Sequence, residues 1–224
     1  MSKSATRGRP KKDASSLELR NDQILAAACQ MFAARGYAGT DVEELAAELG
    51  IGKGTIYRAF NSKQELFFAA VNRALELMMA FIKTEADAEN AEGVARIQAG
   101  VKAFLRFFDQ NPEVIELFIQ ERAAFANQKS STFWDHSKRH SSRWQAFFQE
   151  LMDLGYVRKL DARWLAETLN QLLYGQLFLH RMENDQASLE SRSQNILTLF
   201  FTGILTSKGL EATAFGADKG DQLS

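Results

Sequence analysis

The stretch ELGIGKGTIYRAF, residues 48–60, decides how this chain is interpreted. Its three glycines at alternate positions, with a lysine between two of them, suggest at first a loop that holds nucleotide phosphates. A Walker-type loop has a glycine five residues before its Gly-Lys pair and a Ser or Thr directly after it. Here Ala47 lies five residues before Gly52, and the residue after Lys53 is Gly54. A dinucleotide fingerprint needs G-x-G-x-x-G after a strand, so the spacing excludes both nucleotide-binding interpretations.

Helical periodicity around this stretch predicts helices joined by tight turns. A first helix is expected over residues 17–35, with Gly36 supplying a left-handed C-terminal cap. A short second helix ends at Gly50, a third covers residues 53–60, and a long fourth follows to residue 82. Two short helices joined by a tight turn and packed on a longer helix form the helix-turn-helix arrangement.

The starts of these helices carry capping signals. Thr40 and Glu43 have the spacing of a capping box before the second helix, and Ser62 and Glu65 have it before the fourth. Gly52 is expected at the N-cap of the third helix, where a glycine supplies no side-chain hydrogen bond.

The third helix is expected to present one face to DNA. A step of 100° per residue places Ile56 and Phe60 on its inner face. An outward arginine can reach a base edge or a phosphate, hydroxyl groups suit phosphate oxygens, and a glycine allows close approach to the groove. Lys63, in the first turn of the fourth helix, is unfavourable beside the helix dipole and so favours an anionic partner. The outward face consists of Gly54, Thr55, Tyr57 and Arg58.

The residues from 24 to 71 resemble the amino-terminal signature of the TetR family of bacterial transcriptional regulators. One departure is Gly52, which occupies a position where the family usually has a Ser or another polar residue. After about residue 75 only the architecture and the length are similar to the family. The matching elements are Phe32, Gly36-Tyr37, Thr40, Leu45-Ala46, Gly50-Ile51, Lys53-Gly54-Thr55-Ile56-Tyr57, Phe60, Lys63 and Glu65-Leu66.

The resemblance implies an all-α homodimer with an amino-terminal helix-turn-helix DNA-binding domain and a carboxy-terminal helical domain for ligand binding and dimerisation. In such proteins a small-molecule effector changes the separation of the two DNA-reading heads and releases DNA. Two heads about 34–36 Å apart, or a multiple of that, suit a near-palindromic operator in double-stranded DNA. Carried over by position, the DNA contacts are Thr40, Lys53, Gly54, Thr55, Tyr57, Arg58 and Lys63.

The composition agrees with a globular protein that has local rather than general affinity for nucleic acid. Apolar residues make up 46% and charged residues 25% of the 224 residues, and the net charge is −1. The single cysteine, Cys29, cannot form an internal disulfide, no signal-peptide pattern is found, and no apolar run is long enough to span a membrane. These features favour a cytoplasmic protein.

The chain is expected to divide into a flexible basic arm, a DNA-binding domain, a helical sensing domain and a frayed tail. In the arm, Arg7 and Arg9 flank the bend of RGRPKK and resemble arms that enter narrow minor grooves, although a solvated tail is the alternative. The four segments are residues 1–16, 17–82, 83–208 and 209–224. Helices in the sensing domain are expected over residues 93–110, 113–127, 131–154, 161–183 and 188–208.

The last two helices are predicted to form the dimer interface, because their apolar residues cover more than one stripe. The alternative is a pair of fully buried core helices in a monomer. The apolar residues are Trp164, Leu165, Leu169, Leu172, Leu173, Leu177, Phe178, Ile196, Leu197, Leu199, Phe200, Phe201, Ile204 and Leu205.

The sensing domain is rich in aromatic residues and could enclose an apolar cavity with a few polar anchors. Most of these residues are expected to be core, and a satisfied buried polar group or an interface contact is the alternative for each anchor. The candidate ligand residues are Phe104, Phe108, Phe118, Arg122, His140, Trp144, Asn170 and Tyr174.

No enzymatic or metal chemistry is expected. His136 and His140 lie four residues apart, but no cysteine or carboxylate completes a metal-binding set near them. No nucleophile–base spacing or cofactor loop is found. The resemblance therefore implies a DNA-binding repressor released by a small apolar or amphipathic ligand. The alternative is a regulator of the same fold whose carboxy-terminal domain binds a partner protein or no ligand.

Overall fold

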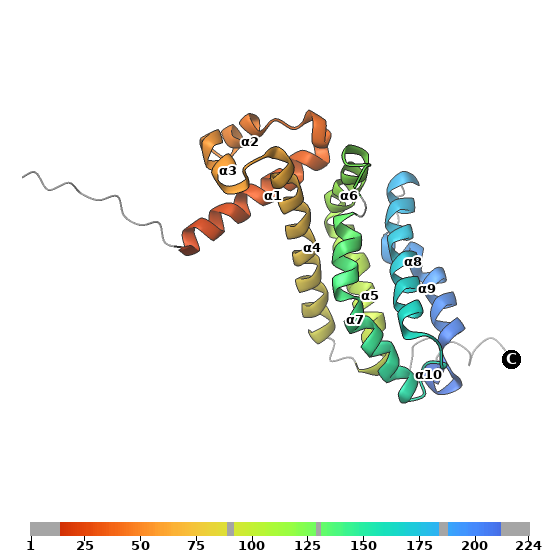
Figure 1. The fold of residues 1–224 in the computed structure, drawn as a ribbon. Coiled ribbons are helices and arrows are strands. Elements are labelled where there is room, and N and C mark those ends of the chain that lie inside the picture. Colours follow the sequence, from red (N-terminus) through yellow and green to blue (C-terminus); the bar gives the residue numbers. More distant parts are fainter. Residues whose placement is uncertain (1–13, 89–91, 129–130, 184–187, 212–224) are drawn as a thin grey trace, which may run out of the picture. The chain divides into compact units, whose positions relative to one another are not determined.

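The structure, a computed structural model, describes residues 14–88, 92–128, 131–183 and 188–211. In these residues every regular element is a helix, as predicted, and a single isolated antiparallel bridge joins Val157 to Leu205 (Figure 1). The chain separates into two compact units, Met1–Ala70 and Val71–Ser224. The division therefore falls inside the fourth helix, earlier than residue 82.

The first unit consists of three helices and the start of a fourth. They are α1 (Ala14–Gly39), α2 (Val42–Glu48), α3 (Lys53–Phe60) and the first residues of α4 (Lys63–Ala88). The ring of Phe67 packs edge-on against Phe32 at a centroid distance of 5.0 Å and against Tyr37 at 5.4 Å. The other buried core residues include Ile24, Ala28, Met31, Val42, Leu45, Ala46, Ile56 and Leu66.

Two glycines set the turns of this unit. Gly36 leaves the helical conformation with φ 72° and ψ 166°, so α1 is interrupted there and ends with one further short turn. Gly50 has φ 63°, and its N–H donates to the Ala47 carbonyl at 3.0 Å. The N–H of Ile51 donates to the Ala46 carbonyl at 2.9 Å, which completes a Schellman cap. Gly50 thus ends α2 as predicted and fixes the turn into α3.

The predicted capping box at Thr40 is wrong, because the N-cap of α2 is Asp41. The Asp41 carboxylate accepts a hydrogen bond from the Glu43 N–H at 2.7 Å. Thr40 is instead buried, and its hydroxyl donates to the Gly36 carbonyl at 2.8 Å. The break at Gly36 leaves that carbonyl without a helical partner, so the threonine is used to satisfy it.

The capping signal before α4 is confirmed in part. The Ser62 hydroxyl accepts from the Glu65 N–H at 3.1 Å, as an N-cap should. The Glu65 carboxylate does not return to the Ser62 backbone and accepts from the Asn61 side chain at 2.9 Å.

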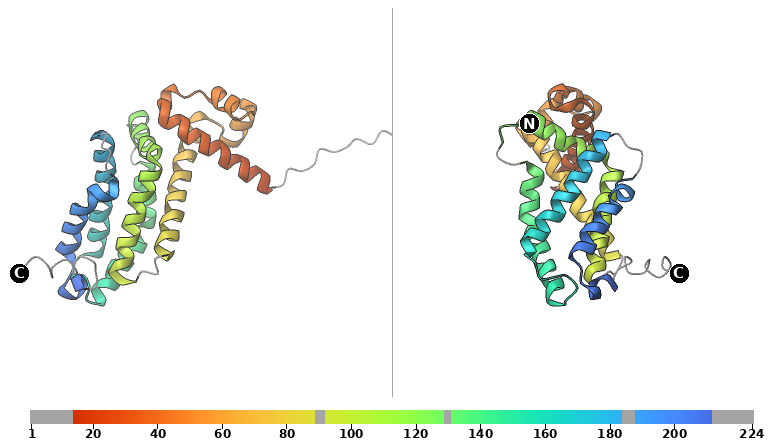
Figure 2. Two further views of the ribbon diagram at one scale, coloured as in Figure 1. Left: turned by 180° about the vertical axis from the view of Figure 1, so that it is seen from behind. Right: turned by 90° about the vertical axis from the view of Figure 1, so that its right-hand side faces the viewer.

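The second unit contains the remainder of α4 and six further helices. In both figures α7 and α8 lie side by side, as do α5 and α9 (Figures 1 and 2). Its core is mainly aliphatic and aromatic, with Leu105, Phe108, Phe118, Phe148, Leu151 and Leu177 almost fully buried. The helices are α5 (Gly93–Gln110), α6 (Pro112–Ala124), α7 (Thr132–Asp153), α8 (Ala162–Glu183), α9 (Leu189–Ile204) and α10 (Ser207–Glu211).

The predicted single helix over residues 188–208 is wrong at its C-terminal end. Leu205 has an extended backbone (φ −75°, ψ 148°), so α9 ends at Ile204. The cause is tertiary: the N–H of Arg158 donates to the Ile204 carbonyl at 2.9 Å, and the N–H of Thr206 donates to the Tyr156 carbonyl at 3.0 Å. The short helix α10 follows at 207–211, and the rest of the predicted tail lies outside the described residues.

We call this contact between residues 204–209 and 154–158 the C-terminal clasp. The Thr206 hydroxyl donates to the Gly155 carbonyl at 2.7 Å, and the Lys208 ammonium donates to the Leu154 carbonyl at 2.8 Å. The same ammonium lies 4.6 Å from the centre of the Tyr156 ring. Gly209 is buried at the clasp, where an added Cβ would overlap the Tyr156 carbonyl oxygen.

Candidate nucleic-acid interface and ligand pocket

Helix α3 buries one face and exposes the other, as the periodicity predicts. Ile56 is 1% exposed and belongs to the core of the first unit. Lys53, Gly54 and Arg58 are exposed, and the two hydroxyl residues Thr55 and Tyr57 are half-buried. The N-cap, Gly52, has an extended backbone (φ −75°, ψ 140°) and makes no side-chain cap, as expected of glycine.

The fold does not require a glycine at position 54. A Cβ added to Gly54 would meet no atom within 4 Å, and the residue lies in a regular helix. Gly50 differs, because its φ of 63° belongs to the left-handed region that side chains disfavour. A missing side chain at 54 lets an external molecule approach the helix backbone closely, which agrees with a helix that enters a DNA groove.

The cations of this surface differ in their partners. Lys53 pairs with Glu43 at 3.2 Å, and this hydrogen bond raises the pKa of Lys53. Exposed ion pairs are weak, so a phosphate can replace Glu43 without a large loss. Arg58 is exposed and has no ion pair or hydrogen bond from its side chain to any described residue. The Arg58 guanidinium is therefore available for recognition of an external group.

Lys63 is held beside the end of α1. Its ammonium donates to the Ala38 carbonyl at 3.3 Å and lies 4.9 Å from the centre of the Tyr37 ring. Burial, and secondarily Tyr57, raise the pKa of Tyr37, so this ring stays neutral under the lysine. These contacts hold the Lys63 ammonium close to the N-terminus of α4. A phosphate bound there would also meet the positive end of the helix dipole.

Of the other predicted DNA contacts, the structure describes only Thr40, which is not exposed. The Thr40 side chain is buried and satisfies the end of α1, so its hydroxyl has a structural role. Arg7 and Arg9 lie outside the described residues.

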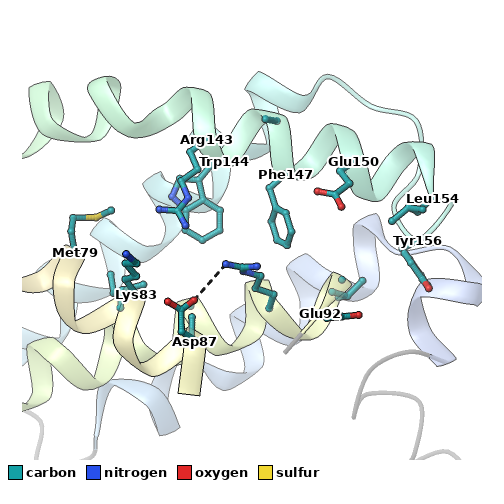
Figure 3. A pocket seen from close by; sticks show the side chains of 17 residues that line it. Met79, Lys83, Asp87, Glu92, Arg143, Trp144, Phe147, Glu150, Leu154 and Tyr156 are labelled. Atoms are coloured by element: carbon teal, nitrogen blue, oxygen red, sulfur yellow. Dashed lines mark ion pairs between the residues drawn. The ribbon is translucent and has the colours of Figure 1, made fainter. Parts of the chain in front are cut away.

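A pocket of about 770 Å³ lies in the second unit between α4, α5 and α7 (Figure 3). Of the predicted ligand residues, only Trp144 lines it. Its walls combine apolar and aromatic side chains with three basic and three acidic residues. The lining residues include Met79, Ile82, Lys83, Asp87, Glu92, Val94, Arg96, Arg143, Trp144, Phe147 and Glu150.

The other predicted ligand residues are distributed through the second unit. Phe104, Phe108 and Phe118 are buried and contact one another in sequence, with centroid distances of 4.9 Å and 6.1 Å. Tyr174 stacks on Phe133 at 4.6 Å. These four residues therefore contribute to the aromatic core.

The predicted polar anchors do not converge. Arg122 is exposed and donates to the Ala126 carbonyl at 3.1 Å. His140 is exposed, and Asn170 is half-buried on α8.

A buried carboxylate, Glu121, was missed by the sequence interpretation. It is 2% exposed, and one of its oxygens accepts from the N–H and the hydroxyl of Thr132 at 2.7 Å and 2.8 Å. The other oxygen, Oε2, is buried without a hydrogen-bond partner among the described residues. Burial raises the pKa of Glu121. Its position three residues after Phe118 and four before Phe125 was the available signal for burial.

Two further groups near the aromatic core have shifted pKa values. Burial, and secondarily the charge of Glu121, raise the pKa of Tyr174 to about 12. Burial, followed by His140 and Arg139, lowers the pKa of His136 to about 4, so His136 is neutral at pH 7. Among the described residues, no three His, Cys, Asp or Glu side chains are grouped as a metal site would require. Nor does any described helix combine the length and apolar character needed to cross a membrane.

The fold of the first unit and the exposed face of α3 are those of a helix-turn-helix DNA-binding domain. A family model described as "Bacterial regulatory proteins, tetR family" matches residues 24–70, which include this face.

Two known transcriptional regulators are similar to this chain in sequence. The chain is 29% identical over 101 residues to the HTH-type transcriptional activator FasR of Mycolicibacterium smegmatis, which covers 45% of this chain and 46% of FasR. It thus matches less than half of the length of that relative. It is 26% identical over 174 residues to the uncharacterized HTH-type transcriptional regulator YxaF of Bacillus subtilis, covering 75% of this chain and 88% of YxaF.

A solved structure shares the fold. A TetR-family transcriptional regulator from Pectobacterium atrosepticum has a TM-score of 0.69 and 22% identity, with coverage of 88% of this chain and 99% of that chain. Residues 24–70 therefore match the DNA-binding domain of the tetR family, and the named relatives support a DNA-binding transcriptional regulator.

Proposed function

We propose that this protein is a cytoplasmic repressor that binds a near-palindromic operator as a homodimer and is released from it by a small amphipathic ligand. The observation that carries the proposal is the exposed face of α3, where Gly54 and Arg58 have no role within the described fold. In a helix-turn-helix protein this helix lies in the major groove, so Arg58 would reach a base edge or a phosphate.

Exposed apolar side chains on the last two long helices support the homodimer. Leu165, Leu169 and Leu177 face the core of the second unit and are buried. In contrast, Trp164 is 55% exposed on α8 and Leu199 is 73% exposed on α9. Large apolar groups exposed together on neighbouring helices are typical of an interaction surface, and a second copy of the chain would cover them.

The pocket supports regulation by a small molecule over regulation by a protein partner alone. Its volume of about 770 Å³ falls within the range of small-molecule sites. Repression is proposed as the usual mode of the family, whereas the relative FasR is named an activator. A reporter gene placed behind the operator separates the two modes, because repression lowers its expression when the protein is present.

The DNA-binding face is tested by selecting bound sequences from a random pool of DNA and measuring affinity for the selected site. We expect Arg58→Ala to weaken specific binding by about 1–3 kcal/mol and to relax the preference at one base pair in each half-site. The matched control is Arg158→Ala, an exposed arginine of the second unit, which should leave affinity unchanged. Unchanged affinity and sequence preference in Arg58→Ala would mean that this face does not read DNA.

A further inference from the structure

We infer that the pocket between α4, α5 and α7 binds an amphipathic anion, with its acidic group between Lys83 and Arg143 and its apolar body against Trp144 and Phe147. This inference rests on the proposed ligand response and names the chemical class of the effector. The pocket and all of its lining residues belong to the second unit.

Two cations at one end of the pocket have no anionic partner in the part of the chain that the structure describes. Lys83 on α4 and Arg143 on α7 lie at the same end of the pocket (Figure 3). Neither side chain forms an ion pair or hydrogen bond with a described residue. Like charges brought together repel, and an anion bound between them would remove that repulsion and gain charge-assisted hydrogen bonds.

Asp87, one of the carboxylates that line the pocket, is already paired. Asp87 lies four residues after Lys83 on the same helix, a spacing at which lysine and aspartate can pair. It pairs instead with Arg96 of α5 at 3.6 Å (Figure 3). Of the three basic residues that line the pocket, Arg96 is thus neutralised from within, while Lys83 and Arg143 remain for a ligand.

The middle of the pocket offers apolar surface next to these cations. Trp144 and Phe147 are half-buried and project into the pocket from α7 (Figure 3). Opposite them, a Cβ added to Gly100 would lie 3.5 Å from the edge of the indole, so Trp144 packs directly over the α5 backbone. Met79, Ile82 and Val94 add aliphatic wall. A ring system or a short aliphatic segment would be removed from water here.

The opposite end of the pocket fixes the orientation of the ligand. Glu92 and Glu150 lie there, away from Lys83 and Arg143 (Figure 3). Arg143 and Glu150 are two helical turns apart on α7, which corresponds to about 10 Å. These carboxylates repel a second anionic group, so the site favours a molecule with a single acidic head that faces Lys83 and Arg143.

Two fluorescent probes with the same ring system test the charge requirement. They are 1-anilinonaphthalene-8-sulfonate and its neutral counterpart N-phenyl-1-naphthylamine, and each is titrated into the full chain without DNA. Since a hydrogen bond to a charged group contributes enough for about a tenfold change in affinity, we expect the sulfonate to bind at least about tenfold more tightly than the neutral probe.

Matched variants locate the site. In Lys83→Gln combined with Arg143→Gln, both exposed positions, the sulfonate should lose its advantage while the neutral probe binds as before. The control pair Lys102→Gln and Arg158→Gln removes the same charge from exposed positions outside the pocket and should keep the wild-type preference. Ala146→Trp, which fills the pocket from an exposed position of α7, should reduce binding of both probes.

The inference is overturned if the two probes bind alike, if neither binds, or if the Lys83 and Arg143 double variant keeps the preference for the sulfonate. Retained sulfonate binding in Ala146→Trp also overturns it, because the probe then binds elsewhere. Operator binding of the same proteins, measured without probe, is independent of this result. Loss of all DNA binding in the wild type would contradict the proposed function, whereas the probe titrations decide the ligand class alone.

Discussion

The exposed face of α3 and the C-terminal clasp each contain a helical glycine, and the two glycines have opposite surroundings. A Cβ on Gly54 would meet no atom within 4 Å, whereas a Cβ on Gly209 would overlap the Tyr156 carbonyl oxygen and lie 3.0 Å from Leu205. The fold therefore requires glycine at 209 and leaves position 54 open. The difference separates residues used by the fold from residues left available for a partner outside it.

The largest effect is expected from Gly209→Ala. The added methyl group must displace the backbone at Tyr156, which also accepts the hydrogen bond from the Thr206 N–H. Overpacking of this kind destabilises by about 1–3 kcal/mol, and we expect the upper end because the opposing atom is backbone. Chemical denaturation of the full chain provides the measurement.

The control for this variant is Gly100→Ala in the same unit. A Cβ there makes an ordinary contact of 3.5 Å with Trp144, and alanine is the better helix former. Gly100→Ala should be neutral or slightly stabilising. Equal stability of the two variants would show that the clasp does not constrain position 209.

Gly54→Ala should have the opposite effect, with a modest gain in stability and weaker DNA binding. Alanine in place of an unconstrained helical glycine stabilises by about 0.5–1 kcal/mol. A methyl group on the groove-facing side of α3 holds the helix away from the bases, and we expect operator affinity to fall by about tenfold, which is about 1.4 kcal/mol. Thermal unfolding and an operator titration measure the two effects on one sample.

Position 100 serves again as the comparison, since Gly100→Ala changes a helical glycine that is not on α3. Its operator affinity should equal that of the wild type. If Gly54→Ala binds the operator as tightly as Gly100→Ala does, the openness at position 54 has no function in DNA recognition.

The first unit was largely predictable because its signals are local. The positive φ at Gly36, the end of α2 at Gly50, the glycine N-cap of α3 and the bounds 53–60 all follow from spacing and backbone chemistry over a few residues. The wrong prediction of Thr40 as the N-cap also concerns only a few neighbouring residues. The sequence has two adjacent residues that can cap, and the choice of Asp41 depends on the Gly36 carbonyl, which only the folded turn presents.

The second unit was predictable in its helices and not in its contacts. The bounds of α5 agree with the expected residues 93–110, because Gly93 and the Asn111-Pro112 pair mark its ends. The end of α9 depends on hydrogen bonds to residues 156 and 158, almost fifty positions away in the chain, and no local pattern encodes them. The pocket likewise depends on contacts between distant parts of the chain, since its basic end combines side chains from α4 and α7.

Arg58 and Glu121 differ in the same way as the two glycines, because one charged group lies at the surface and the other is buried. Arg58 is exposed and pairs with none of the described residues, so water solvates it until a partner binds. One oxygen of Glu121 is buried without a hydrogen-bond partner from any described residue, and ionisation of the carboxyl group there costs stability. Replacement of a partner-free surface charge should affect binding, whereas replacement of this buried one should affect folding and its pH dependence.

The smallest effect is therefore expected from Glu121→Gln, which keeps the oxygen that accepts from Thr132 and removes the ionisable group. Because the pKa of Glu121 is raised in the folded protein, its contribution to stability is fully present below the pKa of the unfolded chain and is lost as the pH rises through the folded value. The variant should match the wild type near pH 4 and exceed it by about 1 kcal/mol at pH 8.

The measurement must be the difference between variant and wild type at each pH, because His136 adds a slope of its own. Its pKa is lowered from 6.5 to about 4, so the stability that its neutral form provides is present above pH 6.5 and is lost in both proteins as the pH falls toward 4. Glu76→Gln, at an exposed position of α4, should show no difference from the wild type across the range. A difference for Glu121→Gln that does not grow with pH would mean that the carboxylate is stabilised inside the protein by a group that compensates for its burial.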